Sequence, residues 1–265
     1  MPEDLPLDKY RSYLLLFESE LIRPDNWNKQ NHQHFQKIFT WNDEYVDQRR
    51  YFKFNFTHSG PTCSVPFAAK TKFCTLIAGN KSVDHPFELY SKRIEAIRWF
   101  EKYHPEDFEF YGMGWDLHKF TTPLLAKVFN RIPPLRKKFS EKWPSYRGSV
   151  RDKLLVLKNY RFSICYENAY GIPGYVTEKI FDSLSAGCIP IYWGAPNIKN
   201  FIPANCFIDR TAFRSYEDLY FYLKAMSASE YDQRLAAISA YLVSEAHRQF
   251  EPAANAQSVA GNIIT

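Results

Sequence analysis

The stretch YRFSICYENAYGIPGYVTEKIFDSLSAGCIPIYWGAPNIKNFIPANCFID, from Tyr160 to Asp209, decides the fold of this 265-residue chain. Residues 161–166 form a short apolar and aromatic run of the length of a buried strand. Residues 176–186 carry apolar side chains at a helical spacing, and residues 189–193 form a second apolar run. Two glycines and a proline favour a tight turn before the helix. The order strand, loop, helix and strand predicts a parallel βαβ unit.

Polar side chains gather in this loop and at the start of the helix. In such units, ligands bind beyond the carboxyl ends of the strands. The candidate binding residues at that edge are Glu167, Asn168, Tyr175, Glu178 and Lys179. The first turn of a helix has unpaired N–H groups and suits a phosphate, Lys179 would add a full positive charge, and Glu178 could hold ribose hydroxyls. The pattern predicts a site for a diphosphate-bearing nucleotide. The alternative is an ordinary solvated helix start with surface charges.

The segment YEN…GYVTEKIFDSLSAGCIPIYWGAPN resembles the signature of the α-1,3/1,4-fucosyltransferases, glycosyltransferase family 10. That signature is an aromatic-Glu-Asn, then Tyr-Val/Ile-Thr-Glu-Lys, then Ala-Gly-x-Ile/Val-Pro-Ile/Val-x-x-Gly. The resemblance implies an α/β fold of the GT-B type, with two Rossmann-like lobes facing across a cleft. It also implies GDP-fucose as the donor, held by the C-terminal lobe, and an oligosaccharide or lipopolysaccharide as the acceptor. Two alternatives stay open, namely another nucleotide sugar and an inactive relative that binds GDP or glycan without turnover.

Strand-like and helical patterns alternate from about Phe67 onward, as in a Rossmann-like lobe. We therefore expect residues 67–265 to form the C-terminal donor-binding lobe and residues 1–66 to form a partial N-terminal, acceptor-side lobe. The resemblance implies several more βα units ahead of the position of Leu14, so we expect either that this lobe is abbreviated or that the chain is a fragment. Residues 58–66, with a glycine and two prolines, are the best linker candidate.

The sequence patterns of three later segments lead to further expectations. Residues 121–143 are rich in lysine and proline and are expected to form helix fragments and loop. Residues 230–250 are expected to form one amphipathic helix, and residues 251–265 are expected to be frayed. The last helices could also pack back on the N-terminal lobe.

The composition excludes several classes of protein. With 22 Phe, 18 Tyr and 6 Trp the chain is not disordered. A net charge of +5 fits an anionic nucleotide or peripheral association with an anionic membrane face, but it is too weak to indicate nucleic acid. The N-terminal residues do not resemble a secretory signal, and no run of eighteen apolar residues occurs. We therefore expect a cytoplasmic protein, either free or at the inner face of the membrane. If the chain belongs to a longer eukaryotic one, we expect a Golgi protein. The cysteines form no CxxC pair and are expected to be buried free thiols; they are Cys63, Cys74, Cys165, Cys188 and Cys206.

Sugar transfer from a nucleotide requires that the departing diphosphate be neutralised. The sequence contains no Asp-x-Asp, so we expect a transferase that uses neither a metal nor another cofactor, with GDP-fucose as donor substrate. Lys179 is the first candidate for this charge. Arg93, near the start of a predicted helix over residues 88–103, is the second, because the resemblance implies an arginine that contacts the donor phosphates. Lys92 and Arg98 remain alternative matches, and a solvated helix charge is the simpler interpretation.

The reaction also requires a general base that takes the proton of the acceptor hydroxyl. Glu18 follows a predicted strand over residues 13–17 and resembles the catalytic glutamate of the family, which usually follows a glycine, whereas Phe17 stands here. Glu20 is close by, and a surface carboxylate at a strand end is the other interpretation. One base suffices for inversion at carbon one, so a β-linked donor would give an α-linked product.

Overall fold

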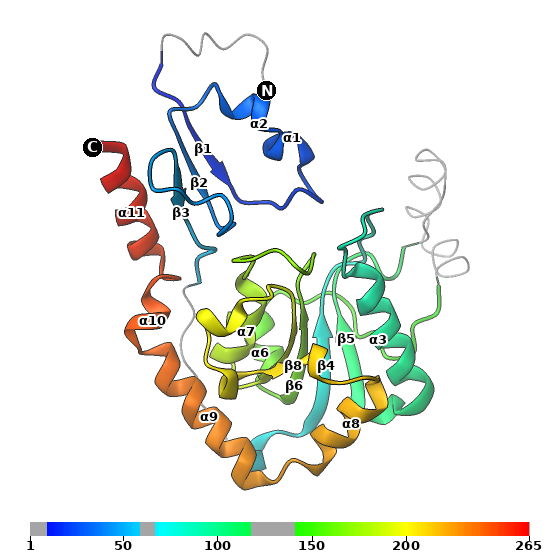
Figure 1. Cartoon of the computed structure of the whole chain (residues 1–265). Coiled ribbons are helices and arrows are strands. Elements are labelled where there is room, and N and C mark those ends of the chain that lie inside the picture. The colour runs from blue at the N-terminus through cyan, green and yellow to red at the C-terminus, as the bar shows by residue number, and fades with distance from the viewer. Residues whose placement is uncertain (1–9, 59–66, 118–140, 265) are drawn as a thin grey trace.

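The computed structural model describes residues 10–58, 67–117 and 141–264, and its strands form two parallel sheets (Figure 1). The first sheet has the order β1-β2-β3, with β1 (Tyr13–Leu16), β2 (Lys37–Thr40) and β3 (Tyr51–Lys53). The second has the order β5-β4-β6-β7-β8, with β4 (Lys72–Ile77), β5 (Phe108–Tyr111), β6 (Tyr160–Tyr166), β7 (Ile189–Trp193) and β8 (Ile208–Asp209). The expected α/β class with parallel sheets is confirmed.

The helices follow the strands in chain order. They are α1 (Pro24–Trp27), α2 (Lys29–His32), α3 (Tyr90–Tyr103), α6 (Lys153–Leu157), α7 (Glu178–Ser185), α8 (Tyr216–Ala225), α9 (Ala228–Leu242), α10 (Glu245–Arg248) and α11 (Pro252–Ile264). The helix fragments and loop predicted over residues 121–143, and the linker predicted over residues 58–66, lie almost wholly outside the described residues. None of the described helices is both long and apolar enough to span a membrane.

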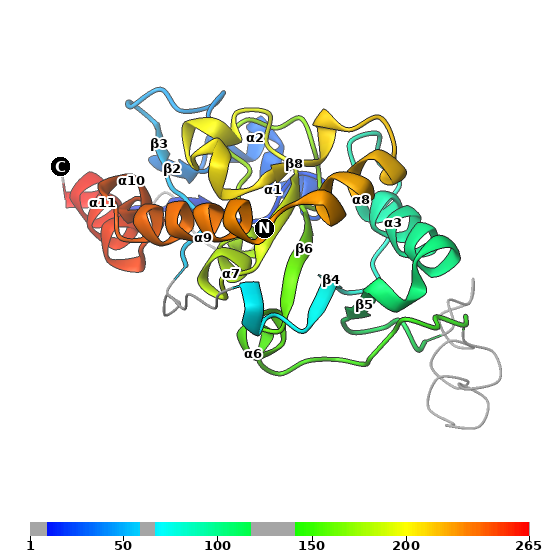
Figure 2. The same ribbon diagram turned by 90° about the horizontal axis from the view of Figure 1, so that it is seen from below.

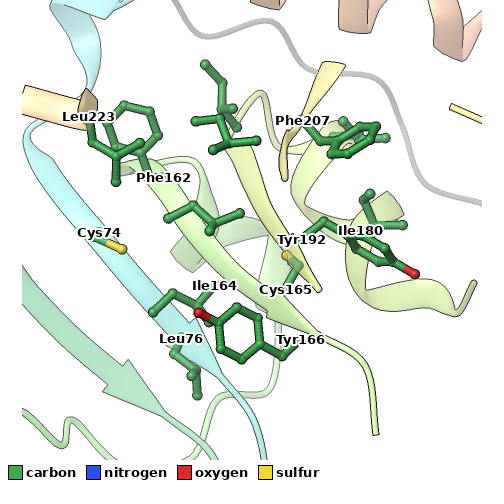
Figure 3. Packing of buried hydrophobic residues seen from close by; sticks show 14 of the residues in the cluster. Cys74, Leu76, Phe162, Ile164, Cys165, Tyr166, Ile180, Tyr192, Phe207 and Leu223 are labelled. Carbon is green, nitrogen blue, oxygen red and sulfur yellow. The ribbon is translucent and has the colours of Figure 1, made fainter. Parts of the chain in front are cut away.

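Strand β6 is the centre of the second sheet, and both of its faces are covered. Figure 3 shows Phe162 and Tyr166 of β6 beside Cys74 of β4 in the core. On the other face, the hydroxyl of Ser163 donates to the hydroxyl of Ser183 in α7 over 2.7 Å. This two-sided burial explains why the strand reads as a continuous apolar run and not as an alternating one. The four cysteines of the described residues are buried free thiols, as expected.

The C-terminal helices connect the second sheet to the first. Figures 1 and 2 show α9, α10 and α11 running in series along one side of the molecule, with α11 beside β3. Two predictions for this segment were wrong. The chain is not one helix over residues 230–250, because α9 ends at Leu242 and α10 begins only after Ser244. Residues 252–264 are not frayed, because they form α11.

Helix α11 is stabilised by contacts with the first sheet that no local pattern reveals. Val259 and Ile263 pack against the cluster of Phe39, Phe52 and Phe54. The backbone N–H of Asn55 donates to the side-chain oxygen of Asn255 over 2.9 Å, and the side chain of Lys37 donates to the carbonyl of Asn262. The last helix therefore packs on the N-terminal sheet, so the two ends of the described chain support one another.

The loop after β6 contacts the first sheet at Gly174. Its φ is +82°, and a Cβ there would lie 2.2 Å from the carbonyl oxygen of Trp41. The next residue, Tyr175, packs its ring 4.5 Å from that of Trp41, and the backbone N–H of Asp43 donates to the carbonyl of Pro173. Only glycine combines this backbone conformation with so close an approach.

An ion pair and an amide extend this contact. The ammonium of Lys53 lies 2.6 Å from one carboxylate oxygen of Asp43, and the side chain of Asn197 donates to the other over 2.8 Å. The side-chain oxygen of Asn197 accepts from the backbone N–H of Gly174 over 2.9 Å. The two sheets are therefore connected through a network of directed hydrogen bonds as well as through aromatic packing.

Replacement of Gly174 by alanine tests this contact. We expect Gly174→Ala to lower the free energy of unfolding by about 3 kcal/mol or more, because the positive φ costs about 1–2 kcal/mol and the collision with Trp41 adds to it. Gly171→Ala is the matched control, since Gly171 has φ +78° but nothing within 4 Å of its virtual Cβ. Urea unfolding measures both, and equal losses would show that the Trp41 contact is unimportant.

Candidate functional site

A cavity of about 330 Å³ opens between the two sheets at the carboxyl ends of the strands of the second sheet. Its walls come from the ends of β4 and β5, the starts of α3 and α7, and two residues of the N-terminal part of the chain. Every candidate from the sequence except Glu167 lines it, namely Glu18, Arg93, Asn168, Tyr175, Glu178 and Lys179. The expectation that polar residues gather at this edge of a parallel sheet is therefore met by the geometry.

Glu167 lies beneath the cavity and not in its lining. Its side chain is 0% exposed, and one carboxylate oxygen accepts from the backbone N–H of Thr177 over 2.8 Å. The other accepts from the Thr177 hydroxyl over 2.6 Å and from the ammonium of Lys179 over 3.3 Å. The structure thus contradicts the prediction that Glu167 contacts a ligand directly. The residue positions the first turn of α7 instead.

Gly194 is the last residue of the Ala-Gly-x-Ile-Pro-Ile-x-x-Gly motif, and its lack of a side chain leaves space for this carboxylate. A Cβ on Gly194 would lie 2.5 Å from both the Cγ of Glu167 and the hydroxyl of Tyr192. The backbone N–H of Glu167 also donates to the carbonyl of Trp193 over 2.8 Å. The glycine and the glutamate of the motif are therefore packed against each other, although 27 positions separate them.

Lys179 places its ammonium at the start of α7. Besides Glu167, it donates to the hydroxyl of Thr177 over 2.9 Å and lies 3.7 Å from a carboxylate oxygen of Glu178. Burial alone would raise the pKa of Glu178, but Lys179 and Lys153 outweigh it and lower that pKa. The start of α7 is thus a well-ordered group of charges around the partial positive charge of the helix end.

Arg93 reaches the same cavity from α3. It is 4% exposed, and its guanidinium donates to the carbonyl of Tyr166 over 2.7 Å and to the side-chain oxygen of Asn168 over 3.0 Å. Burial lowers the pKa of Arg93, and Tyr90 and Glu167 oppose that shift, but an arginine keeps its charge. The alternatives Lys92 and Arg98 pair with carboxylates on the outside of α3 and do not line the cavity.

Tyr175 and Glu18 form the opposite wall. Tyr175 is buried against Trp41, and burial raises the pKa of its hydroxyl. Glu18 is exposed, and its backbone is fixed on both sides. The indole N–H of Trp27 donates to the carbonyl of Glu18 over 2.8 Å, and that of Trp41 donates to the carbonyl of Phe17 over 2.9 Å. Two tryptophans therefore hold the backbone that carries Glu18 in the lining of the cavity.

Sequence reasoning missed two further lysines of the cavity, Lys81 and Lys153. The ammonium of Lys153 lies 2.8 Å from a carboxylate oxygen of Asp182 in α7. No motif marks either residue. Among the described residues, the cations of the lining are these two lysines, Arg93 and Lys179, and its carboxylates are Glu18 and Glu178. The cavity therefore presents cations to an anion, although Asp182 and Glu167 already pair with two of them. In the described part of the chain, no group of three or more His, Cys, Asp or Glu side chains could hold a metal ion.

Replacement of Glu167 by glutamine tests whether its buried carboxylate holds the start of α7. We expect Glu167→Gln to lower the free energy of unfolding by about 2–4 kcal/mol, because the amide leaves Thr177 and Lys179 without their charged acceptor inside the protein. Glu178→Gln, next to the same lysine but with a side chain 43% exposed, should cost no more than about 1 kcal/mol. Denaturant unfolding compares the two, and a smaller loss for Glu167→Gln than for Glu178→Gln would contradict this role.

The segment that contains most of these residues is similar in sequence to known proteins. Residues 138–246 match the model for the C-terminal domain of glycosyltransferase family 10 (fucosyltransferase). The chain is 40% identical over 77 residues to the α-(1,3)-fucosyltransferase FucT of Helicobacter pylori, which is 29% of this chain and 16% of that protein. It is 39% identical over 70 residues to an α-(1,4)-fucosyltransferase of Arabidopsis thaliana, which is 26% of this chain and 17% of that protein.

The fold has a solved counterpart. An α1,3-fucosyltransferase crystallised with GDP-fucose superposes with a TM-score of 0.52 at 17% identity, over 89% of this chain and 67% of that one. At this identity the likeness shows the fold alone, and it supports the GT-B arrangement expected from the sequence. The signature residues 167, 168, 175, 178 and 179 all fall within the family match. Residues 138–246 of this chain therefore match the C-terminal domain model of glycosyltransferase family 10, the fucosyltransferases, within a chain of GT-B fold.

Proposed function

We propose that the chain transfers fucose from GDP-fucose to a hydroxyl of a glycan, with inversion and without a metal ion. One observation supports this proposal above the others. A single cavity is lined both by Glu18, which follows the first strand of the first sheet, and by Arg93 of α3 and Lys179 of α7, the helices that pack with the second sheet. This is the arrangement that transfer between two bound substrates needs, with a base on one side and cations for a leaving diphosphate on the other.

The donor side is argued from the contacts at the start of α7. Backbone N–H groups of the first helical turn, the ammonium of Lys179 and the guanidinium of Arg93 would together neutralise the diphosphate. Lys179 is already held by Glu167 and Thr177, so little side-chain freedom is lost when a phosphate binds. Glu178 is partly exposed beside this group and would accept hydrogen bonds from the ribose. Asn168, fixed by Arg93, would donate its amide N–H to a phosphate or sugar oxygen.

The acceptor side is argued from Glu18. In the proposed step its carboxylate takes the proton of the acceptor hydroxyl, the acceptor oxygen forms a bond to carbon one of fucose, and the bond from that carbon to the β-phosphate oxygen breaks. GDP leaves with the electron pair of that bond. Attack on the face opposite the leaving group converts the β-linked donor to an α-linked product. We propose the 3-hydroxyl of an N-acetylglucosamine or similar residue as the acceptor position.

The matched segments cover only about a sixth of the curated relatives' length, so activity, linkage and acceptor are proposals for this chain. Two alternatives differ from the leading proposal in what they bind. A related transferase would use another nucleotide sugar, since a helix start and a lysine recognise diphosphate whatever the base. An inactive relative would bind GDP or glycan without turnover.

Nucleotide binding separates the first alternative. We expect GDP, but not UDP or CMP, to raise the midpoint of thermal unfolding by several degrees, because a ligand that binds only the native state stabilises it. Lys179→Ala should weaken GDP binding by about tenfold or more, since a charge-assisted phosphate contact contributes about 1.5–3 kcal/mol. Lys102→Ala, at the far end of α3, is the matched control. Preference for UDP would reject GDP-fucose as the donor.

Turnover separates the second alternative. We expect Glu18→Gln to lower the rate of fucose transfer to N-acetyllactosamine by about a hundredfold or more while the dissociation constant of GDP stays the same, because only proton removal is lost. Glu217→Gln, an exposed carboxylate on α8, controls for charge. Mass spectrometry of the products measures transfer. Full activity of Glu18→Gln would remove Glu18 from the role of base, and no transfer by the unaltered chain would favour a binding protein.

A further inference from the structure

A second pocket, of about 250 Å³, lies on the first-sheet side of the molecule next to Glu18. We propose that this aromatic pocket, defined by Glu20, Trp27, Trp41, Glu44, Tyr45 and Phe87, binds one neutral or amino pyranose residue of the acceptor glycan. The inference rests on the proposed function, because it names the substrate class that the acceptor side of the cleft would take.

The walls of the aromatic pocket have the character of a sugar site. Trp27 lies at its centre, with ring centroids 5.0 Å from Trp41 and 5.6 Å from Tyr45. Phe87, from the loop before α3, closes the other side; it is 46% exposed and its edge meets Tyr170. A pyranose offers apolar C–H faces to such rings and hydroxyls to polar groups at the rim. Trp27 and Trp41 are buried and Tyr45 is half-buried, so the exposed ring of Phe87 is the apolar surface that a partner would cover.

The polar side chains of this pocket are two carboxylates, the amide of Asn42, the hydroxyl of Tyr45 and the imidazole of His85. Glu20 and Glu44 are exposed at its rim, and no lysine or arginine lines it in the described part of the chain. Burial and the charges of Glu20 and Glu44 raise the pKa of the Tyr45 hydroxyl, and all three residues line the pocket. Lys29 lies 4.8 Å from the centre of that ring but not in the lining. Carboxylates accept hydrogen bonds from sugar hydroxyls or an amino group, and they repel an acidic sugar.

The pocket is connected to the proposed base. Glu20 follows Glu18 by two residues, which span at most about 7 Å of chain. Trp27 contributes both to the pocket and, through its indole N–H, to the support of the Glu18 carbonyl. Trp41 packs on Tyr175, so the two cavities share one aromatic wall. A pyranose held against Trp27 and Phe87 would therefore lie beside the carboxylate that takes the acceptor proton.

Direct binding tests the proposal without relying on turnover. The whole chain is titrated calorimetrically with N-acetyllactosamine and, separately, with its sialylated, acidic form, each with and without GDP. We expect the neutral glycan to bind more tightly than the acidic one. Phe87→Ala should weaken binding of the neutral glycan by about five- to tenfold, as expected for one lost aromatic contact, and leave GDP binding unchanged. Phe221→Ala, an exposed phenylalanine of α8, should change neither.

A charge variant gives an independent readout. Glu44 is exposed, so Glu44→Gln should fold, and we expect it to reduce the preference for the neutral over the acidic glycan several-fold. Unchanged binding in Phe87→Ala, equal binding of the two glycans by the unaltered chain, or no binding of the neutral glycan would each overturn the proposal. If the chain binds glycan as expected but not GDP, the proposed transfer fails and the pocket stands. If it binds GDP and no glycan, the pocket fails and only the donor side of the proposed function stands.

Discussion

The site depends on the hydrogen bonds of one buried carboxylate, that of Glu167, with Thr177 and Lys179. A fully buried carboxylate without partners would cost several kcal/mol, so the groups that satisfy it are held in place. Those groups are the N–H and hydroxyl of Thr177 and the ammonium of Lys179. They tie the end of β6 to the first turn of α7 and orient the lysine at the cavity. The residues of the motif therefore form one packed unit, and its order along the chain follows from that packing.

The loop that leaves this unit also fixes the opposite wall. It passes through Gly174, whose missing Cβ lets the backbone reach Trp41, and then buries Tyr175 against the same indole. Trp41 in turn holds the carbonyl of Phe17, next to Glu18. The separation between Glu18 and Lys179 is thus set by a short series of contacts through one loop and one tryptophan. This coupling explains why a small N-terminal sheet can present a carboxylate at a defined place.

Sequence patterns predicted the parts of the structure that local interactions determine. The elements predicted over residues 88–103, 161–166, 176–186 and 189–193 agree with α3, β6, α7 and β7 to within one or two residues, because their apolar spacing and turns are local. The site candidates lie together because parallel strands end at one edge. The prediction that Glu167 contacts a ligand was wrong because its burial depends on Thr177 and Gly194, which lie 10 and 27 positions away in the sequence. Helix α11 was missed because Val259 has partners only on the first sheet. Lys153 carries no motif, and only its approach to Asp182 brings it to the cavity.

The two pockets beside Glu18 differ in charge, and this difference bears on how a transfer could be ordered. Cations dominate the cavity at α7, while carboxylates rim the aromatic pocket beyond the Trp41–Tyr175 wall. A diphosphate is attracted to the first and repelled by the second, and a neutral glycan has no electrostatic reason to enter the first. Charge would therefore direct the diphosphate to the cavity at α7, whereas a neutral glycan would be held in the aromatic pocket by its rings. Because Glu18 lies at the boundary, the acceptor hydroxyl and the carbon that it attacks would meet there, where a general base is needed.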